Sequence, residues 1–169
     1  MKTLGDFLLI LQLGTGLFWI ITYILIIKRG FQDKTYGMPM AAICANISWE
    51  FIFSFIYPHK SPQNIINIIW FILDIVIMFQ YLGYGRKRFK KYMPEKFFYA
   101  SFFMTLGISF LIIMAITFEF KDFEGKYAAF GQNLMMSALF ISLLTRRGNL
   151  SGQSIYIAVF KMVGSCLLP

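Results

Sequence analysis

The sequence predicts an all-α integral membrane protein, a compact polytopic helix bundle with five clear spans and a partial sixth. Of its 169 residues 58% are hydrophobic and only 14% are charged, and the mean hydropathy is +0.65. This composition excludes an ordinary soluble domain. The apolar residues are grouped in segments of about 20, the length that crosses a bilayer as a helix. The strict alternation that a membrane barrel needs is absent from these segments.

The chain is expected to form one transmembrane helical domain over residues 1–169. The first segment starts after only Lys2 and Asp6 and lacks a small-residue cleavage site, so we interpret it as a retained helix rather than a signal peptide. The last segment contains Lys161 and is still apolar where the sequence stops at Pro169. This predicts that the chain is incomplete at its C-terminus. The spans are expected at 7–27, 38–57, 64–84, 97–117, 127–144 and 152–168.

Basic residues are concentrated in alternate loops. Loops 28–37, 85–96 and 145–151 hold eleven of the sixteen Lys and Arg residues, whereas the opposite side holds four. Positively charged loops stay in the cytoplasm, so we expect these three loops to be cytoplasmic and the N-terminus to be outside. This topology explains the net charge of +8 better than nucleic-acid binding does. Cys44 and Cys166 show no disulfide or metal-site spacing.

Glu50 is the most informative residue because it is ionisable and lies within an apolar segment. A charge near the bilayer centre costs at least about 2.5–3.5 kcal/mol, and acids in such positions are usually functional. The helical rise places Glu50 about 10 Å below the outer end of its span, and Asp74 about 15 Å deep on the next, antiparallel span. We therefore expect the two carboxyls to open into one cavity in the outer half of the membrane.

Helical spacing groups amide and aromatic side chains around the two acids. Residues three, four and seven positions apart share a helix face, which predicts a polar centre within an aromatic-walled pocket. Glu50 and Asp74 are the catalytic candidates. An alternative is that the amides of the fifth span only hydrogen-bond the helices together. The predicted substrate-binding residues are Asn46, Trp49, Phe53, Tyr57, Trp70, Met78, Tyr81, Gln132 and Asn133.

This set of residues suits acid-initiated cyclisation of a polyprenyl chain. Apolar surroundings disfavour a carboxylate anion, so Glu50 is expected to be protonated near neutral pH and to act as a general acid. Protonation of an epoxide or alkene generates a carbocation, which each aromatic ring stabilises by about 0.5–2 kcal/mol. No Asp-rich magnesium motif occurs, so we predict neither a metal nor a cofactor. His59 is predicted to be a solvated loop residue rather than a ligand.

Three stretches resemble the integral-membrane terpene cyclases of fungal meroterpenoid and indole-diterpene biosynthesis, which have bacterial relatives. They are Asn46-Ile47-Ser48-Trp49-Glu50-Phe51, the Tyr57-Pro58 end of that helix, and Trp70-Phe71-Ile72-Leu73-Asp74. Lys161-Met162-Val163-Gly164-Ser165 is similar to a Lys-x-x-Gly-Thr/Ser element of the same family. The likeness covers about residues 40–168, and Asn-x-x-Trp-Glu is its most specific part.

The resemblance implies a bundle of seven helices and a cyclisation that starts with protonation of a terminal epoxide or olefin. It gives Glu50 the role of the proposed acid and matches Asp74 to the acid of the third helix. It places a second essential acid in a final helix that this sequence lacks. The implied partners are a lipophilic prenyl or terpenoid substrate, membrane lipid and a prenyltransferase or epoxidase, with no nucleic acid.

Two alternatives stay open on the sequence alone. Pro62-Gln63 matches the dipeptide of PQ-loop transporters for small solutes or protons, which are built from three-helix repeats, but the second half has no matching pair. The second alternative is a non-catalytic membrane interaction protein, in which Glu50 pairs with a cation of a partner protein or with Lys161.

Overall fold

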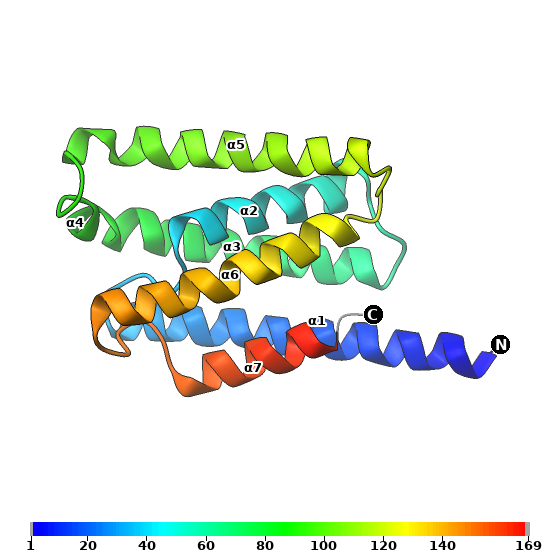
Figure 1. The fold of residues 1–169 in the computed structure, drawn as a ribbon. Helices are drawn as coiled ribbons and strands as arrows, with labels where there is room; N and C mark the ends of the chain where they lie inside the picture. The colour runs from blue at the N-terminus through cyan, green and yellow to red at the C-terminus, as the bar shows by residue number, and fades with distance from the viewer. Residues whose placement is uncertain (1, 168–169) are drawn as a thin grey trace.

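The structure is a computed structural model that describes residues 2–167, with side chains described from Asp6 onward. It confirms the all-α prediction, since the described residues contain helices and no strand. The helices, which Figure 1 shows, are α1 (Lys2–Gln32), α2 (Met40–Phe51), α3 (Gln63–Tyr84), the short α4 (Arg86–Phe89), α5 (Phe98–Glu119), α6 (Lys126–Arg147) and α7 (Ile155–Cys166).

Each expected span coincides with one helical segment. Within residues 2–167, four segments are long and apolar enough to cross a membrane, and the segments Met40–Ile56 and Ile155–Cys166 are shorter apolar helices. The first helix continues beyond the expected end at residue 27 to Gln32, where an ion pair of 3.0 Å joins Arg29 to Asp33 one turn on. The expected final residue of the last span, Leu168, lies outside the described residues.

Helix α2 occupies the centre of the bundle. It contacts α3, α5 and α6, and Figure 1 shows it between α5 and α6. Every residue from Ala42 to Glu50 is buried. A helix that is apolar on all sides is covered by protein rather than by solvent. Glu50 therefore reaches the interior of the bundle, where its carboxyl is shielded from the surrounding lipid.

The helices α1 and α7 pack together on one side of the bundle, and α5 lies on the opposite side (Figure 1). Figure 1 shows α6 between α5 and the pair formed by α1 and α7. The loops that join α2 to α3 and α5 to α6 lie at the same end as the N-terminus. The three basic loops lie at the other end, so the two ends of the molecule differ in charge.

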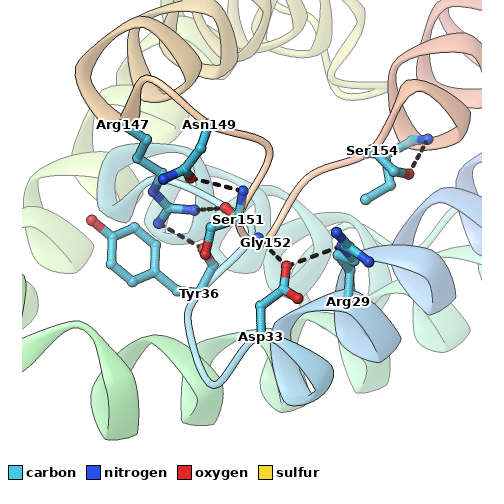
Figure 2. Close-up of polar contacts among 9 residues, drawn as sticks. Arg29, Asp33, Tyr36, Arg147, Asn149, Ser151, Gly152 and Ser154 are labelled. Carbon is cyan, nitrogen blue, oxygen red and sulfur yellow. Dashed lines mark hydrogen bonds and ion pairs between the residues drawn. The ribbon is translucent and has the colours of Figure 1, made fainter.

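A polar clamp at the basic end fixes the start of α7 (Figure 2). The Arg147 guanidinium donates to the main-chain oxygens of Tyr36, at 2.8 Å, and Ser151, and it lies 4.5 Å from the centre of the Tyr36 ring. Asp33 accepts a hydrogen bond of 2.7 Å from the Gly152 amide. These contacts tie the loop between α6 and α7 to the loop between α1 and α2, and they anchor α7 beside α1.

The C-terminal end of α2 continues as a π-helix over Ile52–Ile56. The Tyr57 amide donates to the Ile52 carbonyl at 2.8 Å, and the His59 amide donates to the Phe53 carbonyl at 3.3 Å. Such wide turns are rare and often lie at functional sites. Here the π-helix begins two residues after Glu50 and folds the following loop back onto the end of α2.

Candidate active site

A cavity of about 760 Å³ lies between α1, α2, α3 and α6 and extends to the loops at the N-terminal end of the bundle. The side chains from α1 are three or four positions apart and so form one stripe along that helix. The stripe is about 22 Å long at 1.5 Å per residue. Its members are Leu8, Gln12, Thr15, Trp19 and Tyr23.

The three tryptophans of the sequence, Trp19, Trp49 and Trp70, all line this cavity. The Trp49 indole N–H donates to the Gly125 carbonyl at 3.0 Å, and the Trp70 N–H donates to the Gly16 carbonyl at 3.4 Å. These two rings are thus held in place by their polar ends. An indole face attracts a cation more strongly than any other side-chain ring, so the wall is suited to a positively charged intermediate.

Glu50 stands at the end of a directed chain of hydrogen bonds. The Gln132 amide donates to Asn46 Oδ1, the Asn46 amide donates to Tyr23 Oη at 2.6 Å, and Tyr23 donates to Glu50 Oε1 at 3.2 Å. Glu50 is only 2% exposed, and its Oε2 has no partner among the described residues. Because Tyr23 already donates to Oε1, a carboxyl proton belongs on Oε2.

Asp74 adjoins the Glu50 carboxyl and the Asn46 and Tyr23 side chains. It is 0% exposed, and neither of its oxygens accepts a well-aligned hydrogen bond within the described chain. Neither Glu50 nor Asp74 forms an ion pair with a residue in 6–167. Two adjoining carboxyls without a cation are expected to keep at least one proton, because two anions repel each other strongly in apolar surroundings.

His59 packs at the mouth of the cavity, so the prediction of a solvated loop residue was wrong. Its ring stacks on Phe53 with a centroid distance of 5.5 Å. The Asn67 amide donates to Nδ1 at 2.8 Å, and Nε2 lies 3.0 Å from the Glu124 carbonyl oxygen. The π-helix turns the loop back onto α2 and produces this packing. Both ring nitrogens are occupied, so His59 fastens the two loops of the mouth together.

The acid at the mouth differs from the acid inside. Glu124 forms an ion pair of 2.6 Å with Lys126, and this hydrogen bond lowers the pKa of Glu124 below its ordinary value. Glu124 is therefore a permanent anion near neutral pH and has no proton to give. Glu50, which lacks a cation in the described structure, is the carboxyl on the cavity wall that is suited to proton donation.

Lys161 points into the bundle but does not pair with an acid of the described chain. Its Nζ donates to Asn133 Oδ1 at 3.1 Å and to Ser137 Oγ at 2.9 Å. It lies 5.4 Å from the centre of the Trp19 ring. The Glu50–Lys161 pair that the interaction-protein alternative allowed is therefore not formed.

The structure brings together four of the predicted site residues, namely Asn46, Glu50, Asp74 and Gln132. Glu50 and Gln132 of this group line the cavity, as do Trp49, Trp70 and Asn133. Their roles in catalysis and binding stay predictions.

Five predicted binding residues lie outside the cavity lining, and so does Asp74, so the expectation that both carboxyls open into one cavity was wrong for Asp74. Asn46 instead donates to Tyr23 Oη. Phe53 packs under His59, and Tyr57 packs edge-on against Phe123 at 5.3 Å. Met78 and Tyr81 follow Asp74 along α3, beyond the end of the cavity, where Tyr81 stacks on Phe98 at 5.6 Å. Shared helix faces were the basis for choosing them, and a face continues past the point where the cavity ends.

The contribution of α1 was not foreseen. Gln12, Thr15, Trp19 and Tyr23 follow helical spacing, and this pattern was available in the sequence. The stripe contains no Asp, Glu, Lys, Arg or His, so the charged residues within the spans do not point to it. Tyr23 was consequently missed, although it is the residue that hydrogen-bonds to Glu50.

The sequence profile of the family described as Pyr4-like transmembrane terpene cyclases matches residues 3–168. The chain belongs to this family. No solved structure matches it. The chain is 32% identical over 155 residues to the Pyr4-family terpene cyclase mfmH of Annulohypoxylon moriforme, a match that covers 89% of this chain and 64% of mfmH.

Two further relatives have a similar sequence identity to this chain. Asnovolin H synthase nvfL of Aspergillus novofumigatus (strain IBT 16806) is 30% identical over 162 residues, which cover 94% of this chain and 66% of nvfL. Terpene cyclase macJ of Penicillium terrestre is 29% identical over 157 residues, which cover 89% of this chain and 60% of macJ.

Membership of the Pyr4-like family confirms the resemblance found in the sequence. It supports the cyclase hypothesis and supports neither the transporter nor the interaction-protein alternative. The matched part of the chain spans 60–66% of the length of these three relatives.

Proposed function

We propose that the protein is a membrane-embedded terpene cyclase that protonates a terminal epoxide or olefin of a polyprenyl substrate and guides the cyclisation of the resulting carbocation. The observation that carries this proposal is the state of Glu50. Tyr23 occupies one of its oxygens, and the other is buried without a partner among the described residues. Glu50 also lines a cavity whose wall contains all three tryptophans. Family membership supports the same activity.

In the proposed reaction Glu50 transfers the proton on Oε2 to the epoxide oxygen or the terminal alkene carbon. With an epoxide, the C–O bond breaks as the neighbouring double bond attacks the carbon, and each new ring passes the positive charge to the next alkene. The last cation gives a proton to a water molecule, and Glu50 is reprotonated, so the substrate and the product are isomers. The Tyr23 hydrogen bond stabilises the Glu50 carboxylate, because a hydrogen bond to an ionised acceptor is about twice as strong as a neutral one.

The cavity suits such a cation in size and in lining. Its volume of about 760 Å³ lies in the range of small-molecule sites, about 300–1,000 Å³. Each tryptophan face adds about 0.5–2 kcal/mol of cation stabilisation. Apolar aromatic walls limit the contact of the cation with water, which would otherwise capture it before the rings close.

The proposal includes an orientation and two companion reactions. The N-terminus and the mouth of the cavity face the non-cytoplasmic side, because the basic loops lie at the other end of the bundle. The lipophilic substrate is prepared by a prenyltransferase, which attaches the chain, and by an epoxidase where the terminal group is an epoxide.

Replacement of Glu50 by glutamine tests the proposed acid. The glutamine amide keeps an oxygen for the Tyr23 hydroxyl but has no proton of suitable acidity, so cyclisation of an epoxidised prenyl substrate is expected to fall at least about 100-fold. Product is measured by mass spectrometry in membranes that hold equal amounts of folded protein. Glu95→Gln, at the basic end of the bundle, is the matched control. Undiminished cyclisation by the Glu50→Gln protein would rule out the general-acid role.

A further inference from the structure

A polar cluster joins α7 to the cavity wall through Asn133 of α6. Lys161 and Ser165 are one turn apart on α7, and both donate to Asn133 Oδ1, at 3.1 and 3.0 Å. Lys161 also donates to Ser137 Oγ at 2.9 Å, and the Ser137 hydroxyl donates to the main-chain oxygen of Asn133 at 2.9 Å. All these donors are thus directed toward oxygen atoms of α6.

This pattern fixes the orientation of the Asn133 amide. An ammonium group has only donors, so the amide oxygen must face α7. The NH₂ group must then point away from Lys161 and Ser165. Asn133 lines the cavity, and its Nδ2 donates to no group of the described chain. The cavity wall therefore carries a fixed pair of N–H donors without an acceptor.

We infer that Asn133 Nδ2 binds a carbonyl or enolate oxygen of the polar head group that the prenyl chain carries, and that Lys161 is the positioning residue behind it. The cation on the amide oxygen draws electron density from the NH₂ group, which makes its hydrogens stronger donors. The assignment of this oxygen to the substrate rests on the proposed function. The binding site itself requires only the geometry of the cluster.

The site is rigid and lies close to the proposed acid. Gln132, the residue before Asn133, starts the hydrogen-bond chain that ends at Glu50. Helix α7 approaches α1 closely at Gly164, where an added Cβ would lie 3.0 Å from Trp19 Cδ1. The clamp in Figure 2 holds the start of α7. A head-group oxygen bound at Asn133 would fix one end of the substrate relative to Glu50.

A pair of ring probes tests the site without any cyclisation. 1-Tetralone carries one carbonyl, and tetralin has the same ring skeleton without the oxygen. Binding of each is measured by titration calorimetry on the full protein in nanodiscs, with empty nanodiscs as the blank. The wild type is expected to bind tetralone about 2- to 12-fold more tightly than tetralin, the range for a neutral hydrogen bond of about 0.5–1.5 kcal/mol. The carbonyl stretch of bound tetralone should shift to lower frequency.

Asn133→Asp is the decisive variant because it keeps acceptors for Lys161 and Ser165 while it removes the N–H donors. It should bring the tetralone preference to about one and abolish the infrared shift, and Lys161→Met should reduce both. Asn149→Asp makes the same change in the loop between α6 and α7, away from the cavity lining, and should leave the preference unchanged.

A wild type that does not prefer tetralone, or an Asn133→Asp protein that keeps the preference, would overturn the inference. Thermal unfolding confirms that each variant is folded. If Lys161→Met does not fold, Asn133→Asp alone decides the question, because it retains the partners of Lys161. Tetralone binding requires no proton transfer. The binding result would therefore stand even if the Glu50→Gln experiment contradicted the proposed cyclase activity, so the two failures can be told apart.

Discussion

Tyr23 makes the two oxygens of Glu50 different, because it hydrogen-bonds to only one of them. Its hydroxyl donates to Oε1 and accepts from Asn46, so it has no further hydrogen to give. The carboxyl is thereby oriented with Oε2 free for the proton. An acid that is held in one orientation delivers its proton along one direction, and such positioning is a large part of catalysis by proximity. Tyr23 acts through Glu50, so it is a positioning residue in the proposed reaction.

Tyr23→Phe is expected to lower the turnover number for an epoxidised prenyl substrate by about 10- to 100-fold, a smaller loss than that caused by Glu50→Gln. The aromatic ring remains in the cavity wall, so KM should change little. The variant leaves Asn46 Nδ2 without its acceptor, which should cost about 1–3 kcal/mol of unfolding free energy. Steady-state kinetics and chemical denaturation measure the two effects.

Tyr99→Phe is the matched control, because Tyr99 is exposed on α5 outside the cavity lining. It should match the wild type in both measurements. A Tyr23→Phe protein with wild-type turnover would show that the acid needs no positioning by this hydroxyl.

The ionisable residues were foreseen better than their neutral partners. Glu50 and Asp74 are conspicuous in a sequence, because a carboxyl inside an apolar segment has a large energetic cost. A tyrosine on an apolar helix has no such cost and is often placed at the membrane interface. Only the tertiary structure, in which Tyr23 of α1 hydrogen-bonds to Glu50 of α2, shows that the two residues meet.

At the scale of elements, the junction before α6 holds the mouth of the site together. Gly125 precedes α6 with φ of +68°, and its carbonyl accepts the hydrogen bond from the Trp49 indole. An added Cβ would lie 2.3 Å from Phe53 Cε2, so the ring of Phe53 packs directly on this glycine. The end of α2 and the start of α6 can meet at this distance only because position 125 has no side chain.

Gly125→Ala is expected to destabilise the protein by about 2–4 kcal/mol, because it combines an unfavourable positive φ with overpacking against Phe53. Gly131→Ala is the control, since a Cβ at position 131 of the same helix meets nothing within 4 Å. Thermal and denaturant unfolding in detergent compares the two variants. Equal stability of the two variants would show that the Phe53 ring can move away from a Cβ at position 125 without loss of unfolding free energy.

The spans themselves were predictable because their apolar residues are numerous and continuous. The π-helix at Ile52–Ile56 was not, since its sequence has the apolar composition of any membrane span. The position of His59 depends on this π-helix, and the prediction for His59 failed for the same reason. The π-helix and the position of His59 depend on tertiary contacts, whereas the spans follow from the apolar composition of the sequence.

The whole molecule has two chemically different ends. The loops at the cavity mouth carry the paired acid Glu124 and the packed His59, and the opposite end carries the clusters of Lys and Arg. Because positive loops are retained in the cytoplasm, this difference predicts the orientation of the cavity as well as that of the chain. A substrate would then reach Glu50 from the non-cytoplasmic half of the bilayer.

Cysteine labelling tests this orientation after expression in the inner membrane of a bacterium. Lys60→Cys places a thiol in the mouth loop, and Lys87→Cys places one in a basic loop; both positions are exposed. Cys166 is exposed and is replaced by serine in both proteins, whereas Cys44 is buried and stays. A membrane-impermeant maleimide should label the Lys60→Cys protein in intact cells and the Lys87→Cys protein only after lysis. The reverse pattern would place the cavity mouth on the cytoplasmic side. The prediction that the basic loops are cytoplasmic would then be wrong.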